Sequence, residues 1–206
     1  MPSQVPACTI KELSKKTWPD FARLFSQKNG WDFCWCMYFH RSRSWPGVSG
    51  HCSRAERSAR NRRDKKRLVE TGSSHGILVY ADGEPIGWCQ YGSRAELPRI
   101  DESPHYRGLV LEADTERLWR ITCFVVDKKY RKRGVAGIAL RAALESIKKK
   151  GGGLVEAYPI THFRPGTFGN QSTNGTATMF EKEGFEIVAP FGITKHRTNV
   201  LMRRIV

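Results

Sequence analysis

The sequence contains no run of about 18 apolar residues, so it predicts no membrane-spanning helix. Residues 1–16 are of mixed polarity and lack the apolar core of a signal peptide. We therefore expect a cytoplasmic protein whose six cysteines stay reduced. No linker-like stretch divides the chain, and we expect residues 1–206 to form one domain.

Acidic residues are scarce, because 20 Asp and Glu stand against 35 Lys and Arg, which gives a net charge of +15. Much of this excess lies in residues 54–67, where Glu56 and Asp64 are the only acidic side chains. Such a stretch attracts polyanions. No nucleic-acid-binding motif accompanies it, so a solvated helix face is the favoured interpretation and RNA binding is the alternative.

Two common nucleotide-binding motifs are absent. The chain has no Gly-x-x-x-x-Gly-Lys-Ser/Thr loop and no Gly-x-Gly-x-x-Gly after a strand, which excludes a Walker-type loop and the dinucleotide fingerprint. Instead, the apolar run 121–126 leads into a basic loop that contains Arg131-x-x-Gly134-x-Ala136. A helical pattern of apolar residues follows directly. A buried strand, a loop and a helix are therefore predicted in succession.

The start of that helix predicts a phosphate-binding site. Unpaired backbone N–H groups and the positive end of the helix dipole face the loop there. Gly134 and Ala136 keep the backbone close to a ligand, because neither carries a bulky side chain. We therefore predict that this junction binds a pyrophosphate.

This junction resembles motif A of the GNAT (Gcn5-related N-acetyltransferase) superfamily, whose signature is Arg/Gln-x-x-Gly-x-Gly/Ala after a central strand. The resemblance covers about residues 76–206, and we expect the N-terminal helices and the Cys- and Trp-rich segment of residues 1–75 to belong to the same domain. It implies an α/β (α+β) fold with a mixed, mostly antiparallel central sheet flanked by helices. It also implies acetyl-CoA as co-substrate, with its pyrophosphate on the loop amides.

A second element supports the resemblance. Residues 179–185 are similar to the Tyr-Glu-Lys-x-Gly-Phe stretch of these enzymes, with Phe180 in the place of a tyrosine that often stands near the coenzyme sulfur. Thr173 holds the place of a frequent asparagine. The coenzyme-binding residues that the resemblance implies are Phe124, Val125, Val126, Arg131, Lys132, Arg133, Gly134, Val135, Ala136, Thr173 and Phe180.

The residues that move protons are harder to assign. Some family members carry a glutamate on the central strand at the place that Arg120 holds here. Glu156 and Tyr158 alternate onto one face of the next predicted strand, and we predict Glu156 as the base and Tyr158 as the acid. The other candidates are His162, Glu96 and Glu112.

The Cys- and Trp-rich segment, residues 31–45, is unusually rich in aromatic residues and cysteine. Cys34, Cys36 and His40 suggest zinc, but Cys-x-Cys is tighter than the usual ligand spacing and no second cysteine pair follows. We therefore expect no metal, and we favour core packing or one wall of an acceptor pocket. A nucleophilic role for Cys34 or Cys123 is disfavoured, because the sequence pairs neither with a histidine locally and a buried cysteine is usually inert.

These observations predict an N-acetyltransferase that delivers acetyl from acetyl-CoA to a primary amine by direct attack in a ternary complex. The acceptor is not identified, but a strongly cationic one would be repelled by the net charge, unless the Glu and Asp residues of the loop at 96–116 reverse the field locally. Two alternatives stay open. One is a non-catalytic coenzyme-A-binding or RNA-binding module on the same fold, and the other is an acetyltransferase that acts on aminoacyl-tRNA.

Periodicity and turn residues predict the remaining elements. They are helices at 10–28, 54–70 and 177–183, a hairpin of 77–80 and 84–91, a loop at 161–175, and strands at 154–158, 185–188 and 199–206.

Overall fold

The computed structural model describes residues 7–26, 32–44, 52–109, 117–163, 173–193 and 197–206. The strands are β1 (Cys8–Glu12), β2 (His75–Ala81), β3 (Glu84–Ser93), β4 (Leu118–Val126), β5 (Leu154–Ala157), β6 (Ile160–Phe163), β7 (Glu186–Ile193) and β8 (Arg197–Ile205). The helices are α1 (Trp18–Ser26), α2 (Arg54–Glu70), α3 (Pro104–Arg107), α4 (Val135–Lys149) and α5 (Ala177–Glu181), with short 3-10 turns η1 (Pro98–Ile100) and η2 (Lys128–Tyr130).

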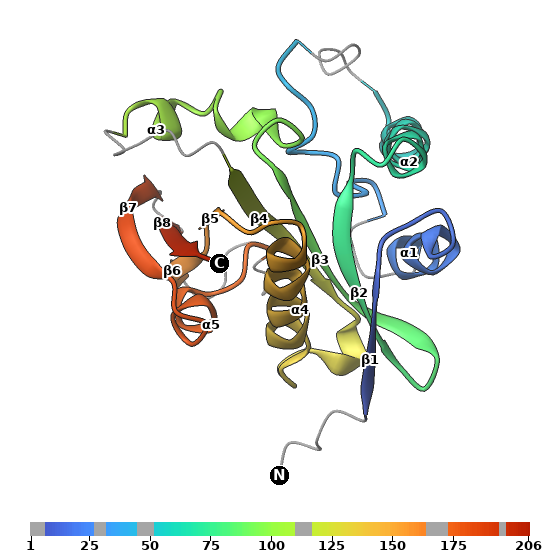
Figure 1. Cartoon of the computed structure of the whole chain (residues 1–206). Helices are drawn as coiled ribbons and strands as arrows, with labels where there is room; N and C mark the ends of the chain where they lie inside the picture. The colour runs from blue at the N-terminus through green and yellow to red at the C-terminus, as the bar shows by residue number, and fades with distance from the viewer. Residues whose placement is uncertain (1–6, 27–31, 45–51, 110–116, 164–172, 194–196) are drawn as a thin grey trace.

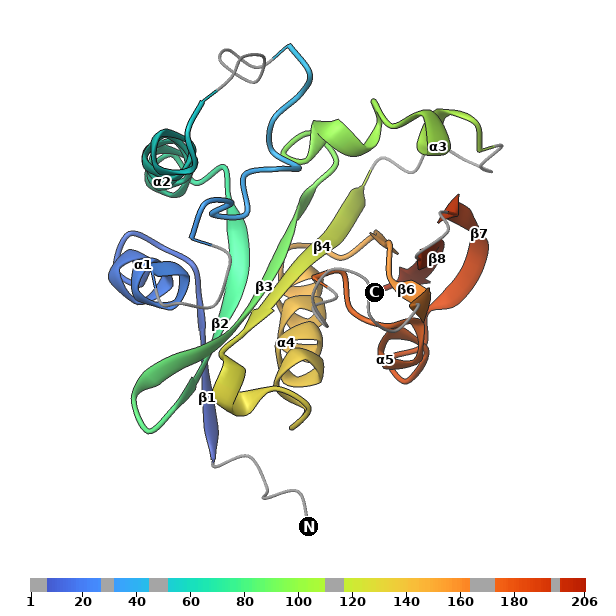
Figure 2. The same ribbon diagram turned by 180° about the vertical axis from the view of Figure 1, so that it is seen from behind.

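The strands form one mixed sheet in the order β1-β2-β3-β4-β5-β8-β6, and β7 also pairs with β8. The β4–β5 pair is parallel, and the other pairs are antiparallel. Helix α4 lies against one face, while α1 and α2 lie on the other side (Figures 1 and 2). The predicted fold class, a mostly antiparallel sheet flanked by helices, is confirmed.

A bulge in β4 decides which of its side chains face which layer. Gln90 of β3 pairs with Cys123, but Tyr91 pairs with Ile121, so Thr122 is an extra residue in β4. Such an insertion reverses the alternation of side chains beyond it. As a result, Ile121 packs in the core under α4 and Cys123 packs in the core under α1.

Several predicted elements match the structure. The hairpin forms around Asp82 and Gly83, whose φ angles of 51° and 78° suit a two-residue hairpin turn. Helix α2 occupies the predicted range and begins with a reciprocal capping box between Ser53 and Glu56. No helix in the described part of the chain is long and apolar enough to cross a membrane.

Two predictions of local structure were wrong. The helix expected at 10–28 is a strand, β1, followed by the shorter helix α1, because residues 8–12 pair with the edge of β2. Ser14 and Thr17 hydrogen-bond each other at the start of α1, which separates the two elements. The loop expected at 161–175 begins with β6, which pairs with β8, and its residues 164–172 lie outside the described residues.

Candidate functional site

The sheet opens where β4 and β5 separate. These strands pair over only four positions, from Leu118–Leu154 to Ile121–Ala157. Beyond that point the backbone N–H of Phe124 instead donates to the carbonyl of Thr173, at 2.5 Å. The carboxyl-terminal half of β4 therefore borders an opening in the sheet, which is a common place for ligands in α/β folds.

The loop after β4 has the geometry expected for a phosphate site. Gly134 is the N-cap of α4, with φ at 87°, and no described side chain caps this helix. A Cβ there would meet nothing within 4 Å, so glycine is favoured by the backbone conformation and not by lack of space. The first N–H groups of α4 are consequently left for a ligand. Arg131 connects the loop to the end of β4, because its Nε donates a hydrogen bond to the carbonyl of Val126 at 3.0 Å.

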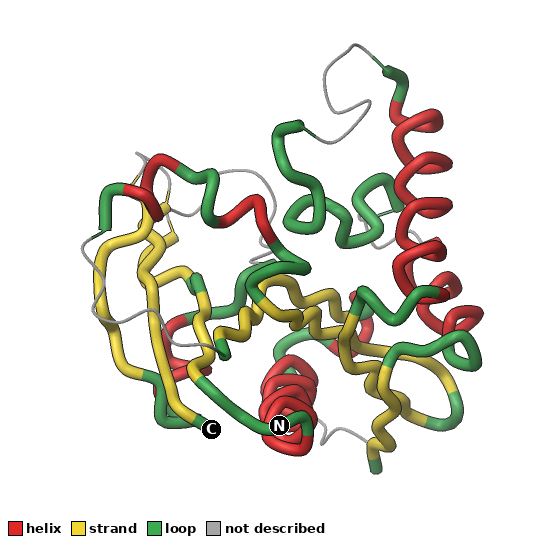
Figure 3. Tube along the Cα trace, turned by 45° about the horizontal axis from the view of Figure 1, so that its top comes forward, coloured by secondary structure: helices red, strands yellow, loops and turns green. Residues whose placement is uncertain are grey.

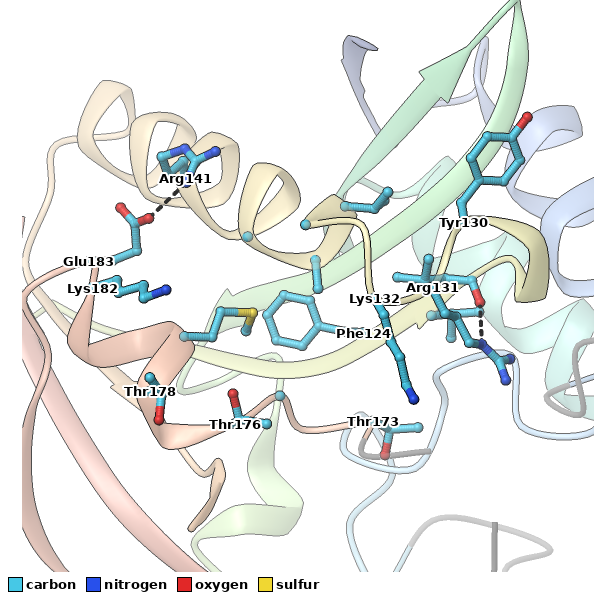
Figure 4. Close-up of a pocket in the computed structure, with 18 residues that line it drawn as sticks. Phe124, Tyr130, Arg131, Lys132, Arg141, Thr173, Thr176, Thr178, Lys182 and Glu183 are labelled. Carbon is cyan, nitrogen blue, oxygen red and sulfur yellow. Dashed lines mark hydrogen bonds and ion pairs between the residues drawn. The ribbon is translucent and has the colours of Figure 1, made fainter. Parts of the chain in front are cut away.

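A pocket of about 590 Å³, here called the α4 pocket, lies between this loop, the first turns of α4 and helix α5 (Figure 4). Its lining residues are Phe124–Val126, Tyr130–Lys132, Gly134–Gly137, Arg141, Thr173, Gly175, Thr176, Thr178, Met179, Lys182 and Glu183. Every predicted coenzyme-binding residue lines it except Arg133 and Phe180. The Arg133 guanidinium lies 5.8 Å from the centre of the Tyr130 ring, and Phe180 is fully buried, with its ring edge-on to Phe124 at 6.0 Å.

The coenzyme-binding residues predicted from the sequence did not include Arg141, Thr178 and Lys182, which line the α4 pocket at α4 and α5. Arg141 lies one helical turn beyond Gly137, and Thr178 and Lys182 are four residues apart at α5. This i,i+4 spacing is the signal that could have identified them. Figure 4 shows Lys182 extending into the pocket, while Arg141 is held by Glu183, with 3.0 Å between Nη1 and Oε1.

The charge of the α4 pocket fits a phosphorylated ligand. Glu183 is the only carboxylate among the described lining residues. The four cationic side chains that line the pocket are Arg131, Lys132, Arg141 and Lys182. Together with the N-terminus of α4, they produce a positive potential where a pyrophosphate would lie.

A second pocket, here called the Cys123 pocket, opens on the opposite face of the sheet. It has a volume of about 290 Å³, and its polar lining includes Gln90, Cys123 and Asn174. Val125 and Thr173 line both this pocket and the α4 pocket. The two pockets therefore meet at the edge of β4, where β4 and β5 have separated.

The Cys- and Trp-rich segment forms one wall of the Cys123 pocket and also packs in the core. Cys34 and Cys36 line the pocket, and the Trp35 ring stacks against Phe25 of α1. Figure 3 shows the segment as a loop beside α2. No group of three or more potential ligands in the described residues could hold a metal ion.

The Cys36 thiol belongs to a buried polar cluster. Its sulfur lies 3.2 Å from Cys123 Sγ and 3.3 Å from Trp88 Nε1. Burial raises the pKa of Cys36, but hydrogen bonds with Cys123 and from Trp88 and the charge of Lys65 outweigh it, and the net pKa is lowered. Lys65 is itself fully buried, and desolvation lowers its pKa to about 8.

His40 occupies the other end of this cluster. Its Nδ1 lies 2.8 Å from the Glu96 carbonyl, so Nδ1 carries the proton and Nε2 accepts from Gln90, at 2.8 Å, and from Lys65, at 3.1 Å. Burial, together with the charge of Lys65, lowers the pKa of His40 well below its usual range. This neutral His40 fixes the end of the Cys- and Trp-rich segment against β3.

Glu156 and Tyr158 lie away from these pockets. Both are buried, and Glu156 accepts hydrogen bonds from Tyr158, at 2.6 Å, and from Tyr106, at 3.0 Å, and pairs with Arg203 and Arg120. Neither residue lines the α4 pocket or the Cys123 pocket. The structure therefore places the predicted acid–base pair in a buried ion-pair network that lines neither the α4 pocket nor the Cys123 pocket.

The other acid–base candidates are dispersed. Glu96 is half-buried and pairs with His75, with 3.1 Å between Oε1 and Nε2. His162 lies in β6, and Glu112 lies outside the described residues. Arg120 is fully buried and pairs with Asp101 as well as Glu156, so it forms part of the same network.

Comparison with known proteins identifies the family. Residues 10–162 match the model of the acetyltransferase (GNAT) family. The chain belongs to the GNAT acetyltransferases. The matched region includes β4, the loop before α4, α4 itself and β5, and thus most of the α4 pocket. No curated protein matches the chain.

Solved structures of this family share the fold. A GNAT-family acetyltransferase from Desulfovibrio desulfuricans has 12% identity and a TM-score of 0.53, with 97% of this chain and 99% of that chain covered. Arabidopsis thaliana NAA60, solved with acetyl-CoA, has 14% identity and a TM-score of 0.53, with coverage of 97% and 100%. The PaiA N-acetyltransferase of Thermoplasma acidophilum, solved with coenzyme A, has 12% identity and a TM-score of 0.51, with coverage of 97% and 99%.

Proposed function

We propose that this GNAT acetyltransferase transfers acetyl from acetyl-CoA to a primary amine by direct attack in a ternary complex. The observation that carries the proposal is the meeting of the α4 pocket and the Cys123 pocket at Val125 and Thr173. Acetyl-CoA in the first pocket and an amine in the second would approach each other from opposite faces of the sheet. Two relatives of the same fold bind acetyl-CoA or coenzyme A, which supports the choice of donor.

In this proposal the α4 pocket holds the coenzyme. The first N–H groups of α4 and the side chains of Arg131, Lys132, Arg141 and Lys182 bind the phosphates. The pantetheine arm follows the open edge of β4, where the Phe124 N–H exchanges its Thr173 partner for the ligand. The amine first loses a proton to water, its nitrogen attacks the thioester carbon, and the carbon–sulfur bond breaks. The second proton that the nitrogen loses passes through water to the sulfur, so the coenzyme leaves as a thiol.

Positioning would supply much of the rate in such a reaction. The described residues of the Cys123 pocket include no carboxylate, and its Gln90, Asn174 and Thr173 are neutral hydrogen-bonding groups. Glu156 and Tyr158 stay the predicted acid–base pair, but their contacts favour a positioning role, because the carboxylate is already bound to two arginines. We infer that the amine loses its proton to water.

The proposal is tested with purified protein, acetyl-CoA and a panel of primary amines, by following the release of free coenzyme A. We expect saturable release that depends on the amine. Calorimetry with coenzyme A alone measures donor binding separately from turnover. Binding without turnover on any amine would leave only the coenzyme-binding part of the proposal.

A further inference from the structure

Three pockets meet around Tyr38, whose side chain is exposed. One is the Cys123 pocket. The second, of about 200 Å³, is here called the arginine pocket, because Arg41, Arg57, Arg60 and Arg99 line it. The third, of about 290 Å³, extends toward Phe191. Tyr38 lines all three, so the entrance to the Cys123 pocket is surrounded by groups from distant parts of the chain.

The guanidinium groups of the arginine pocket come from three separate segments. Arg41 belongs to the Cys- and Trp-rich segment, Arg57 and Arg60 belong to α2, and Arg99 lies in η1. The described lining residues include no carboxylate. Asp64, which pairs with Arg41 at 2.5 Å, lies outside the lining, and Arg57 and Arg99 form no ion pair with any described carboxylate. Like charges brought together at a partly buried site repel one another, so a bound anion would stabilise this arrangement.

Contacts of two residues, Arg99 and Asn61, give the arginine pocket a defined shape. The Arg99 guanidinium lies over the Tyr38 ring, 4.5 Å from its centre, and donates to the Arg41 carbonyl at 3.4 Å. Asn61 of α2 is buried, and its Nδ2 donates to the carbonyls of Phe33, at 2.7 Å, and Cys34, at 3.3 Å. These two bonds fix the orientation of the amide.

The oxygen of the same amide is a second indication of a ligand. Asn61 Oδ1 is buried and has no hydrogen-bond partner among the described groups, although Asn61 lines the pocket. A buried acceptor of this kind is normally satisfied. A ligand that offers an oxyanion to the arginines and an N–H or O–H to Asn61 would complete both sets of contacts.

The arginine pocket is continuous with the proposed acceptor site. Phe33, Cys34 and Tyr38 line both it and the Cys123 pocket. These three shared residues flank a turn at Trp35 and Cys36, both of which have positive φ, at 51° and 46°. Such a conformation is costly for residues other than glycine and persists where the surroundings hold it in place. A molecule in the Cys123 pocket would thus have an anionic end within reach of the arginines.

We propose that the arginine pocket binds a carboxylate or phosphate group of the acceptor, and that the substrate is a small amine carrying such an oxyanion. This inference rests on the proposed function and names its substrate class. The size of the pocket suits one oxyanion and a few neighbouring atoms. It therefore favours a small molecule over a nucleic-acid strand, for which the outer face of α2 is the larger basic surface.

The first test measures binding without turnover. The protein is first saturated with coenzyme A, which occupies the α4 pocket. Calorimetry then measures the binding of O-phosphoethanolamine, of β-alanine, and of ethanolamine, which carries an uncharged hydroxyl in place of the oxyanion. We expect O-phosphoethanolamine or β-alanine to bind and ethanolamine to bind at least about tenfold more weakly, the loss expected for missing charge-assisted hydrogen bonds. Comparison of the first two probes distinguishes a phosphate ligand from a carboxylate.

Variants localise that binding. Arg57→Gln with Arg99→Gln removes two pocket charges, whereas Arg62→Gln with Arg67→Gln removes two charges from α2 outside the arginine pocket. We expect the first variant to lose at least about tenfold in affinity and the second less than about twofold, because only the first removes direct contacts. Arg57→Lys in place of Arg57→Gln should restore part of the affinity.

Three outcomes would overturn the inference. They are no difference between ethanolamine and the two anionic probes, equal losses in both double variants, and binding of a short RNA with none of the small anions. Each is distinguishable from failure of the proposed function. If coenzyme A binds and amines turn over without any preference for an anionic group, the proposed function stands and the arginine pocket is not an acceptor subsite.

Discussion

Glu156 of β5 lies in register with Arg203 of β8, and Arg203 Nη2 is 2.8 Å from Glu156 Oε1. On the other side Arg120 of β4 is in register with the same residue, with 3.6 Å between Nε and Oε2. The carboxylate is fully buried, so it lies between two cations that belong to the neighbouring strands. The network joins β4, β5 and β8 just before β4 and β5 separate.

The first prediction concerns this carboxylate. Glu156→Gln leaves the guanidinium of Arg203 without its charged partner, while Arg120 keeps Asp101. Because removing one partner of a buried pair leaves an uncompensated charge, we expect the free energy of unfolding to fall by roughly 3–5 kcal/mol. The pH profile of kcat should keep its shape. Urea unfolding and pH–rate measurements check the two parts.

Direct catalysis by Glu156 would show in the pH profile. In addition to the loss of stability, kcat would fall by roughly 10²–10⁴-fold, and the acidic limb of the profile would flatten. Tyr158→Phe is the companion variant, because its phenol donates to Glu156 at 2.6 Å. Burial, opposed by the charge of Arg120 and reinforced by Glu156, holds the pKa of Tyr158 well above its usual range, so the phenol keeps its proton. If Tyr158 is the acid, its loss alters the alkaline limb.

The second prediction tests the start of α4. A Cβ on Gly137 would meet only Arg141 Nη1, at 3.8 Å, so a side chain fits there. In Gly137→Asp the carboxylate favours the first turn of the helix by about 0.3–1 kcal/mol but repels phosphate. We therefore expect an unchanged or higher Tm and a loss of at least about tenfold in coenzyme A affinity, measured by calorimetry.

Gly137→Ala is the matched control, because it adds the Cβ without the charge. Its affinity for coenzyme A should stay within about twofold of the wild type, since no direct phosphate contact is removed. Equal affinities for the Asp and Ala variants would show that phosphate does not bind at this turn, and the position of the coenzyme would have to be revised.

Local patterns predicted the core of the α4 pocket well. The strand, the basic loop and the start of α4 are contiguous in the sequence. A glycine in such a loop often indicates a residue with positive φ, and Gly134 has a positive φ. The pocket wall at α5 could also have been inferred in part, because Thr178 and Lys182 are four positions apart and so lie on one face of a helical turn.

Other features depended on pairing between distant segments. Residues 10–12 were included in the helix predicted at 10–28, yet they belong to β1 because their partner is the edge of β2, more than 60 residues later. The bulge at Thr122 could not be predicted either, since strict alternation places Ile121 and Cys123 on one face. The arginine pocket likewise joins Arg41, α2 and η1, which only tertiary structure brings together.

The third prediction is a pH dependence of stability. The groups facing the His40 ring are Lys65 of α2, Gln90 of β3, Ser74 and the Glu96 carbonyl. Because burial lowers the pKa of His40, below about pH 6.5 the unfolded chain binds a proton that the folded chain does not. This residue therefore lowers stability as the pH falls, by up to about 1.4 kcal/mol per pH unit.

The His40→Gln variant removes this titration. We expect its free energy of unfolding, measured in urea at pH 7, 6 and 5, to fall less steeply than that of the wild type. Glu96 pairs with His75 in both proteins, so its contribution to the pH dependence of stability cancels when the slopes of the variant and the wild type are compared. Parallel pH curves would mean that His40 takes up a proton in the folded state, against the neutral assignment.

The fourth prediction concerns the carboxylate in the α4 pocket. Glu183 Oε1 lies 3.0 Å from Arg141 Nη1, so it engages a guanidinium that could otherwise bind phosphate. Glu181 is the last residue of α5, two positions before Glu183, is exposed, and does not line the pocket. The two residues differ in position but not in charge, which makes them a matched pair for substitution.

Glu183→Gln should tighten coenzyme A binding by about three- to tenfold at low salt, because it removes one negative charge beside the phosphates and frees Arg141. Glu181→Gln changes the net charge equally and should shift the affinity by less than about twofold. Calorimetry at two salt concentrations separates the effects, since the gain from Glu183→Gln should shrink as salt screens it. Equal gains in both variants would attribute them to net charge, and Arg141 would then have no direct part in binding the coenzyme.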